Sequence, residues 1–423
     1  MTPIERLFSL EQFGIKLGLD NIRIILAALG HPERAWKSIH IGGTNGKGSV
    51  AAMVECGLRA AGLKTGRYTS PHLDRIEERV AINGSSIDSA TFESVTAQVL
   101  EVVDASMSKG TLTVTPTFFE VSTAIAFQIF KRAAVDVAVV EVGLGGRFDA
   151  TNVLTPAITA ITSIAFDHEK HLGHTLSEIA FEKAGIAKPG VPLVVGHLPA
   201  EAAERIARVA REVGAPLLDA HATSDRKYPP LTLALPGRHQ LENAAVAVAI
   251  LECWSTLIGH VSTEAIVRGL TQCEWPARLE WLHVPPDGEL LIDAAHNPAG
   301  AAALASYLQD TGRNKLPIVF AAMADKDLTN MIGPLAPVAS AFIATTVPNA
   351  RARSAEQLAA EIRRLTPLPV EALQSPEAAV TRALEPTFAK ATVGRPRRAV
   401  ACGSIYMIGP LRARLLEGGA TRL

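Results

Sequence analysis

Apolar residues along the first two thirds of the chain follow two different spacings in turn, and each spacing indicates one kind of element. Runs that are almost wholly apolar predict buried strands, here at 38–41, just before Ser70, and at 135–142, 157–164 and 192–195. Apolar positions at helical spacing, or strong helix formers, predict helices at 4–30, 47–62, 118–132 and 200–213. The run VDVAVVEV suits a parallel strand that is covered on both faces. Strands that alternate with helices predict an open, mostly parallel α/β sheet.

The pattern breaks around 270–282. The stretch TQCEWPARLEWLHVPPDGEL carries a Trp-Pro step and a proline pair, and is typical of a linker. A new α/β series follows, with strands predicted at 289–292, 317–321, 341–345 and 398–401. Because 423 residues are many for one domain, we predict two α/β domains, 1–275 and 276–423, the second smaller and Rossmann-like.

Composition and charge argue against several classes of protein. The net charge is −1, so no general basic field exists to hold nucleic acid. The chain has no apolar run of about 18 residues and no leader-like N-terminus, so we expect a cytoplasmic protein without a membrane span. The four cysteines form no CxxC pair, which argues against a zinc ribbon or a thioredoxin-type redox motif. We expect a monomer that acts on small molecules.

The first chemical signal is a glycine-rich loop, GGTNGKGS at 42–49, between the strand at 38–41 and the next helix. Glycines allow successive backbone N–H groups to turn inward around a phosphate, and the helix N-terminus adds its dipole. Lys47 supplies a mobile cation, and the hydroxyl of Ser49 can bind magnesium. The residues predicted to bind the nucleotide phosphates are Gly43, Thr44, Asn45, Gly46, Lys47, Gly48 and Ser49.

This loop departs from the common pattern GxxxxGK[ST]. Ile41 stands where that pattern has its first glycine, and Gly48 separates the lysine from the serine. A plain tight turn is the alternative, but the flanking strand and helix favour a phosphate loop and a P-loop ATPase-like first domain. No guanine-reading NKxD sequence occurs, since Asn314-Lys315 is followed by Leu-Pro, which favours ATP over GTP.

Polar residues at the ends of predicted strands indicate a metal site beside the phosphates. Ser70 ends the second strand, Glu141 ends the buried run, and His168 follows the next strand. Ligands of open α/β sheets bind beyond the carboxyl ends of the strands. A carboxylate in an apolar strand needs compensation, which magnesium would provide, although a buried ion pair would also explain Glu141.

Other candidates near these strand ends are less specific. His171 and His174 do not predict zinc, because no HExxH spacing and no close cysteine accompany them. We expect both on a surface loop, with His168 alone reaching the site. Lys183 lies on the helix predicted after this loop, where the pattern does not distinguish a surface lysine from a site lysine.

Taken together, these segments resemble the folylpolyglutamate synthase/dihydrofolate synthase family, a branch of the Mur ligase superfamily. The resemblance covers nearly the whole chain. The phosphate loop belongs to the wider superfamily, whereas SPHL and EVGLGGRxDATN are far more specific to the folate branch. The motifs that carry the resemblance are IHIGGTNGKGS (39–49), TSPHL (69–73), EERV (77–80), TFFE (117–120), EVGLGGRFDATN (141–152), SIAFDH (163–168), EKAGI (182–186), HQLENAA (239–245), DAAHNP (293–298) and CGSIY (402–406).

The resemblance implies roles for individual residues in holding ATP and two magnesium ions. Lys47 and Ser49 would hold the triphosphate and one magnesium. Ser70 and Glu141 look like further magnesium ligands, and His168 looks like a ligand of a second magnesium.

The remaining residues matched by the resemblance concern a modified lysine and the substrates. Lys183 matches a lysine that is often carbamylated by carbon dioxide in this family, which turns a cation into a carboxylate able to bind the second metal. The other matches are pterin contacts at Thr117, Phe119, Asp149 and Ala150, ATP contacts at Asn243, Arg278, Asp293 and His296, and an entry side for glutamate near Ser404.

The implied activity is ATP-dependent ligation of dihydropteroate, a reduced folate, or both, to the amine of L-glutamate. A carboxylate accepts an amine poorly, so the γ-phosphoryl group first converts it to an acyl phosphate, and Mg²⁺ with Lys47 neutralises the two anions that meet. The domains would then be an ATP-binding Mur-ligase-like domain over 1–275 and a glutamate ligase domain over 276–423. A Mur-type peptidoglycan ligase and a P-loop ATPase without ligase activity are the alternatives.

Overall fold

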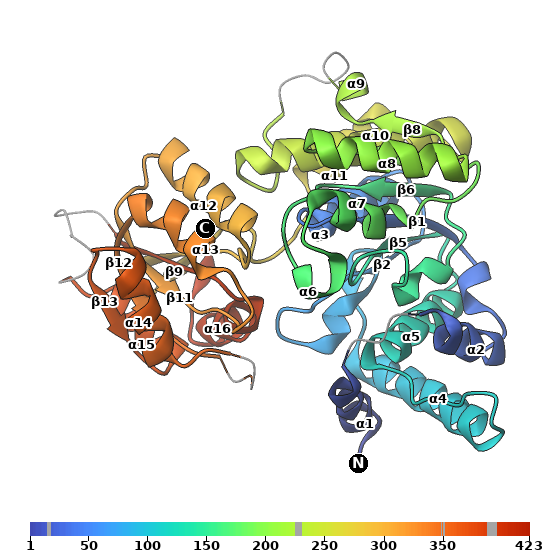
Figure 1. The fold of residues 1–423 in the computed structure, drawn as a ribbon, viewed down its shortest axis with the longest axis horizontal. Coiled ribbons are helices and arrows are strands. Elements are labelled where there is room, and N and C mark those ends of the chain that lie inside the picture. Colours follow the sequence, from blue (N-terminus) through green and yellow to red (C-terminus); the bar gives the residue numbers. More distant parts are fainter. Residues whose placement is uncertain (15–17, 225–230, 348, 350–351, 387–395) are drawn as a thin grey trace. The chain divides into compact units, whose positions relative to one another are not determined.

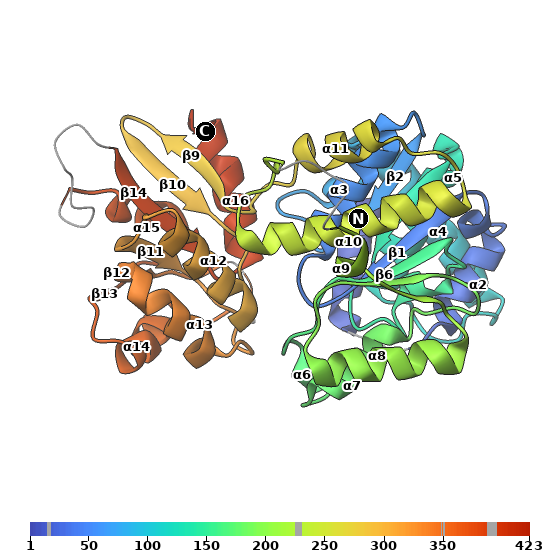
Figure 2. The same cartoon turned by 90° about the horizontal axis from the view of Figure 1, so that it is seen from above.

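The computed structural model describes residues 1–14, 18–224, 231–347, 349, 352–386 and 396–423. The chain divides into two compact units, each an α/β structure built on one sheet (Figures 1 and 2). The first comprises Met1–Ala234 and Leu241–Glu274, and the second comprises Leu235–Gln240 and Trp275–Leu423. Within the described residues, no helix is both long and apolar enough to cross a membrane.

The sheet of the first unit has eight described strands in the order β4-β3-β2-β5-β1-β6-β7-β8. Neighbours from β2 to β8 pair in parallel, and β3 and β4 add an antiparallel edge. The mostly parallel sheet expected from the sequence is therefore confirmed. The strands are β1 (Lys37–Gly42), β2 (Thr65–Tyr68), β3 (Val80–Ile82), β4 (Ser85–Ser86), β5 (Val137–Glu141), β6 (Ile158–Ile161), β7 (Leu193–Val195) and β8 (Leu217–Asp219).

Helices cover both faces of this sheet. A Cβ on Gly66 of β2 would lie 2.8 Å from the Phe130 ring of α5, whereas the next residue, Arg67, points to Glu55 of α3. Because successive strand residues face opposite sides, α3 and α5 lie on opposite faces. The helices are α1 (Pro3–Ser9), α2 (Asp20–Ala28), α3 (Lys47–Ala60), α4 (Ser89–Ser108), α5 (Phe118–Ala133), α6 (Glu169–Leu172), α7 (Leu176–Ala184), α8 (Ala200–Val213), α9 (His221–Ser224), α10 (Arg238–Leu257) and α11 (Thr263–Thr271).

The single helix expected at 4–30 is wrong. Between α1 and α2 the chain forms a 3₁₀ turn, Leu10–Phe13, and then leaves helical geometry at Gly14 (φ 63°) and Gly18 (φ 141°). Residues 15–17 lie outside the described part of the chain. The apolar positions keep helical spacing on both sides of this break, because α1 and α2 pack their apolar residues, Leu7 and Ile22 among them, into the same core.

The second unit has a seven-stranded sheet in its described part, ordered β13-β12-β11-β14-β10-β9-β15. Its strands from β13 to β10 pair in parallel, and β9 and β15 are antiparallel. The strands are β9 (Glu280–Val284), β10 (Gly288–Ile292), β11 (Leu316–Phe320), β12 (Ala339–Ala344), β13 (Val370–Ala372), β14 (Arg397–Cys402) and β15 (Thr421–Arg422). The helices are α12 (Pro298–Asp310), α13 (Leu328–Leu335), α14 (Ala355–Leu365), α15 (Pro376–Ala383) and α16 (Ile405–Glu417).

The linker expected from the 271–290 stretch is wrong in its second half. Glu280–Val284 is strand β9, which pairs antiparallel with β10, and Pro285-Pro286 lie in the turn between them. Proline and glycine favour a hairpin turn as much as a linker, so their presence could not separate the two.

Candidate functional site

The phosphate loop folds as a cradle too narrow for side chains at two of its glycines. A Cβ on Gly43 (φ 139°) would lie 2.0 Å from Thr162 Oγ1, and one on Gly46 (φ 85°) would lie 2.2 Å from Asn243 Oδ1. Gly46 also precedes α3, whose N-terminus has no side-chain cap. The loop therefore brings bare backbone to a helix N-terminus, which is the arrangement that binds phosphate.

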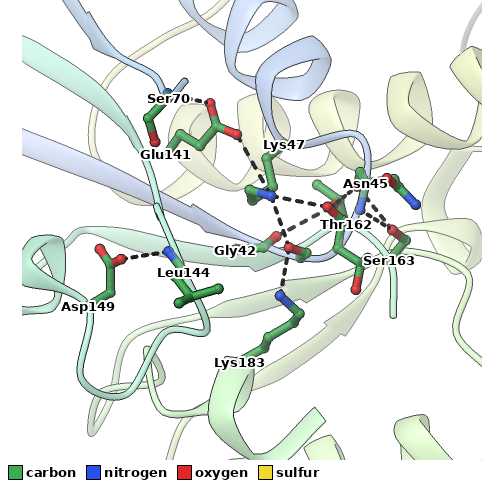
Figure 3. A network of polar contacts seen from close by, with 12 residues as sticks. Gly42, Asn45, Lys47, Ser70, Glu141, Leu144, Asp149, Thr162, Ser163 and Lys183 are labelled. Atoms are coloured by element: carbon green, nitrogen blue, oxygen red, sulfur yellow. Dashed lines mark hydrogen bonds and ion pairs between the residues drawn. The ribbon is translucent and has the colours of Figure 1, made fainter. Parts of the chain in front are cut away.

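Two hydroxyl residues after β6 hold this loop in place (Figure 3). Thr162 Oγ1 donates to the Asn45 carbonyl at 2.6 Å, and Ser163 Oγ donates to the same oxygen at 3.0 Å. The Thr44 N–H in turn donates to the Ser163 carbonyl at 2.8 Å. Sequence reasoning did not single out Thr162, although a hydroxyl directly after an apolar strand was a visible signal.

Two lysines converge on one carbonyl oxygen at the base of the loop. Lys47 Nζ donates to the Gly43 and Thr44 carbonyls at 3.2 and 3.1 Å, and Lys183 Nζ donates to the Gly43 carbonyl at 2.9 Å (Figure 3). Lys183 reaches the loop from the last turn of α7. This pair concentrates positive charge where the sequence places a triphosphate.

Lys183 is a buried residue of this site, so the surface alternative is wrong. Only 5% of it is exposed. Burial and the neighbouring charge of Lys47 lower the pKa of Lys183 to about 7, against an opposing effect of Asp167 and Asp149. A substantial fraction of Lys183 is therefore an uncharged amine at neutral pH.

Glu141 ends β5 beside these lysines and is 5% exposed. Its Oε1 lies 3.9 Å from Lys47 Nζ, and its Oε2 accepts the Ser70 N–H at 3.2 Å (Figure 3). The structure thus joins Ser70, Glu141 and Lys47, as the positions at neighbouring strand ends required. The ion pair with Lys47 compensates the charge of the buried carboxylate.

The histidines after β6 differ in position. His168 begins α6 in the left-handed conformation (φ 53°) with 43% of its side chain exposed, and its Nε2 lies 3.9 Å from Asp167 Oδ1. His171 and His174 are exposed, as expected, but His171 lies in α6 and not in a loop. Asp167 is a further candidate site residue, because its side chain is only 8% exposed and its charge acts on Lys183. Asp167 belongs to the SIAFDH motif but was not predicted from the sequence as a site residue.

The predicted pterin-contacting residues lie at the start of α5 and in the loop after β5. Thr117 caps α5: its Oγ1 accepts the Glu120 N–H at 3.2 Å. A Cβ on Gly143 would lie 2.4 Å from the Phe119 ring, so that ring covers the loop two residues beyond Glu141. The structure therefore brings the TFFE segment against the loop that follows β5.

Asp149 and Ala150 are buried within the same loop. Asp149 Oδ2 accepts the Leu144 N–H at 2.8 Å (Figure 3), and its Oδ1 accepts the Thr151 N–H at 3.0 Å. Burial raises the pKa of Asp149, and these hydrogen bonds oppose that shift. The carboxylate shapes the loop, while Ala150 begins the 3₁₀ turn Ala150–Val153.

The predicted ATP contacts divide between the two units. Asn243 of α10 is buried against Gly46 in the first unit. Arg278, Asp293 and His296 belong to the second unit. There Asp293 accepts the Leu279 and Ala295 N–H groups, each at 2.8 Å. Burial raises the pKa of Asp293, and the charge of Arg278 opposes that shift.

The backbone on either side of Arg278 is unusual. Ala277 (φ 58°) and Leu279 (φ 50°) both adopt the left-handed conformation, which non-glycine residues seldom take. His296 Nδ1 lies 2.8 Å from the Ala294 carbonyl and must donate to it, because a carbonyl only accepts. Non-glycine residues in the left-handed conformation, such as Ala277 and Leu279, cluster at functional sites.

Ser404 is the last predicted substrate residue and lies in the second unit. It precedes α16, is 2% exposed, and its Oγ has no hydrogen-bond partner among the described residues. No side chain caps α16. A buried hydroxyl at an uncapped helix N-terminus suits an anionic group such as a carboxylate.

The residues gathered in the first unit suit a nucleotide triphosphate and a hard divalent cation. The cradle supplies backbone N–H groups, the lysines supply positive charge, and the hydroxyls of Ser49 and Ser70 with the Glu141 carboxylate supply oxygen ligands. Magnesium prefers such oxygens and bridges to phosphates. The arrangement can therefore hold a polyphosphate and bring a second anion to it.

Comparisons with known proteins point to one family. The family model of the Mur ligase glutamate ligase domain matches residues 277–393. Dihydrofolate synthase/folylpolyglutamate synthase of Bacillus subtilis (strain 168) is 34% identical over 429 residues, which covers 96% of this chain and 96% of that protein.

Solved structures show the same likeness. E. coli FolC in complex with DHPP and ADP has a TM-score of 0.84 and 29% identity, and the match covers 99% of this chain and 98% of that one. A bifunctional folylpolyglutamate synthase/dihydrofolate synthase with Mn, AMPPNP and L-glutamate bound has a TM-score of 0.83 and 32% identity, and the match covers 98% of both chains.

Proposed function

The chain belongs to the dihydrofolate synthase/folylpolyglutamate synthase family, and we propose that it is an ATP-dependent carboxylate–amine ligase acting on folates or their precursor. Its acid substrates are dihydropteroate and reduced folates, and its amine substrate is L-glutamate. The observation that carries this proposal is the convergence of Lys47 and Lys183 on the Gly43 carbonyl beside Glu141. A simple nucleotide-binding loop does not need a second buried lysine.

The chemistry explains why so much charge gathers there. An amine cannot displace oxide from a carboxylate, so the γ-phosphoryl group is first transferred to the acid. The triphosphate and the carboxylate are both anions, and Lys47 would neutralise charge on the transferring phosphoryl group. A divalent cation supplies the remaining neutralisation, with Ser49, Ser70 and Glu141 as its proposed ligands.

We assign Lys183 to a second divalent cation, together with His168. The neutral amine of Lys183 would add to carbon dioxide and release one proton, giving a carbamate anion. Burial supports this reaction, because the lowered pKa of Lys183 provides the unprotonated nitrogen that attacks carbon dioxide. The resulting negative charge would face Lys47 instead of repelling it.

The acid substrate is assigned to the surface formed by Thr117, Phe119 and the loop that holds Asp149 and Ala150. Phe119 offers an aromatic face for a pterin, and its ring already lies on Gly143. Asn243, Arg278, Asp293 and His296 are assigned to ATP, and the Ser404 end of α16 is assigned to glutamate.

The domain roles follow the same proposal. The portion up to residue 275 would bind ATP as a Mur-ligase-like central domain, and residues 276–423 would act as the glutamate ligase domain, which the family match at 277–393 supports. The enzyme is further proposed to act as a monomer in the cytoplasm.

Phosphate release from the purified protein tests the proposed function. The expected result is ATP-dependent release that requires L-glutamate together with dihydropteroate or a reduced folate. Release without any acid would indicate a plain ATPase and refute the ligase assignment. Release only with a UDP-sugar peptide acid would assign the chain to peptidoglycan synthesis instead.

A further inference from the structure

One buried cation of the first unit has no carboxylate partner among the residues that the structure describes. Arg79 is 8% exposed. Its Nε donates to His72 Nδ1 at 2.9 Å, and its guanidinium lies 5.0 Å from the centre of the Phe118 ring. Buried arginines are normally paired with an anion, because an uncompensated charge is costly to take out of water.

The groups that Arg79 contacts do not supply that anion. His72 accepts through Nδ1, so its ring proton is on Nε2 and the ring is uncharged. Phe118 offers only the partial negative charge of a ring face. Since guanidinium carries five N–H donors, the terminal amino groups of Arg79 keep the capacity to bind a planar anion through two hydrogen bonds.

Nearby carboxylates are engaged elsewhere. Glu78 accepts the backbone N–H groups of Leu73 and Arg75 at 2.8 and 3.0 Å. Glu77 accepts from the Arg75 guanidinium at 3.2 Å. The protein thus arranges the acidic residues next to Arg79 in sequence so that neither neutralises it.

Arg79 also lies between a segment assigned to the metal and a segment assigned to the acid substrate. Its carbonyl accepts the Thr69 N–H at 3.0 Å, and the following residue, Ser70, donates to Glu141. On the other side, Phe118 stands between Thr117 and Phe119 in the TFFE segment. The backbone of Arg79 is therefore held beside Thr69, one residue before Ser70, and its guanidinium packs on the ring of Phe118.

We propose that Arg79 binds the α-carboxylate of the glutamate residue carried by a folate substrate. This inference rests on the proposed function and distinguishes its two acid substrates, dihydropteroate and a folate. Dihydropteroate has a single carboxylate, the one that is activated. A folate has a second, ionised carboxylate three carbons from the reacting γ-carboxyl group. Arg79 is then a specificity residue for chain extension and contributes nothing to the ligation of dihydropteroate.

The test compares Arg79→Gln with the wild type on both acids, using phosphate release at saturating ATP and L-glutamate. Loss of a charge-assisted hydrogen-bonded pair is expected to raise the KM for tetrahydrofolate about 10- to 100-fold. The KM for dihydropteroate is expected to change less than about 3-fold, on the same principle that a group without a partner contributes no binding. Arg211→Gln, an exposed arginine of α8 in the same unit, is the control and should change neither value.

A substrate-side experiment keeps the proposal testable if Arg79→Gln does not fold. A tetrahydrofolate whose α-carboxylate is replaced by an amide should bind wild-type enzyme weaker by the same factor, and Arg79→Gln should no longer distinguish the two. Equal use of acid and amide by the wild type, or equal losses on both acids in the variant, would overturn the role of Arg79. Wild-type enzyme inactive with every acid would instead refute the proposed function.

Discussion

Replacing Gly43 with alanine tests whether the shape of the cradle determines nucleotide binding. An added Cβ would lie 2.0 Å from Thr162 Oγ1 and 3.1 Å from the Thr162 backbone nitrogen, whereas ordinary contacts begin at 3.4 Å. The hydroxyl cannot move away freely, because it donates to the Asn45 carbonyl at 2.6 Å. Either the loop or the end of β6 must shift by roughly an ångström, a displacement large enough to impair a catalytic geometry.

Two terms set the size of the effect. A non-glycine residue in this region of φ costs about 1–3 kcal/mol. Loss of the Thr162 hydrogen bond costs about a further 1 kcal/mol. We expect Gly43→Ala to lower the free energy of unfolding by about 2–4 kcal/mol and to raise the KM for ATP at least about 10-fold. Gly62→Ala is the matched control, since Gly62 also has positive φ (90°) but nothing lies within 4 Å of the added Cβ.

Urea unfolding gives the stability of each variant, and phosphate release gives its KM for ATP. Gly62→Ala should lose only the backbone term, about 1–2 kcal/mol, with an unchanged KM. In the double variant Gly43→Ala/Thr162→Ala, the two losses should fall short of additivity by about 1 kcal/mol, because both remove the same contact. If Gly43→Ala matched Gly62→Ala in stability and in KM, the close approach to Thr162 would not shape the site.

Three further predictions concern buried ionisable groups. Glu141→Gln should lower kcat by about 100-fold or more through loss of a metal ligand, with a nearly unchanged urea midpoint; a variant that unfolds without a specific loss of activity would make Glu141 a structural ion-pair partner. Burial lowers the pKa of Lys183 to about 7, so the carbamate signal in ¹³C NMR with labelled bicarbonate should grow from about pH 6 to about pH 8 as the amine loses its proton. Lys183→Ala should lack this signal and should recover part of its activity when a short-chain carboxylic acid is added. A fully active Lys183→Ala variant would refute the carbamate hypothesis. Burial lowers the pKa of His40 to about 3, so between about pH 6.5 and pH 3 only the unfolded chain binds a proton at this histidine. The free energy of unfolding should therefore fall on acidification by up to about 1.4 kcal/mol per pH unit because of His40. Urea unfolding at several pH values tests this: if His40→Gln and the wild type lost stability equally per pH unit, His40 would be excluded as the cause.

The features that sequence predicted are those set by local rules. Strand–loop–helix order and glycine spacing located the cradle at 43–49, since only glycine tolerates its backbone and its close contacts. The rule that parallel strands present their carboxyl ends at one edge predicted that Ser70 and Glu141 would meet, and they do. Neither prediction required knowledge of distant contacts.

The features that sequence could not predict depend on distant packing. Lys183 lies 140 positions from Gly43, and no periodicity around it indicates that it is buried on the loop. The hairpin after Glu280 was missed because its turn residues also occur in linkers. Arg79 drew attention only as part of a motif, since a charged residue looks alike in sequence whether or not an anion faces it.

Asp149 shows where a motif and a contact differ. The resemblance implies that Asp149 touches the pterin, and that contact remains a prediction. In the structure both of its carboxylate oxygens already accept hydrogen bonds, from Leu144 and Thr151. Oδ1 already accepts two bonds, from the N–H and the hydroxyl of Thr151, and removing the carboxylate would also release the loop that carries Gly143 under the Phe119 ring. The effect of Asp149→Ala on substrate binding would therefore combine both causes, whereas Phe119→Leu would report on the aromatic contact alone.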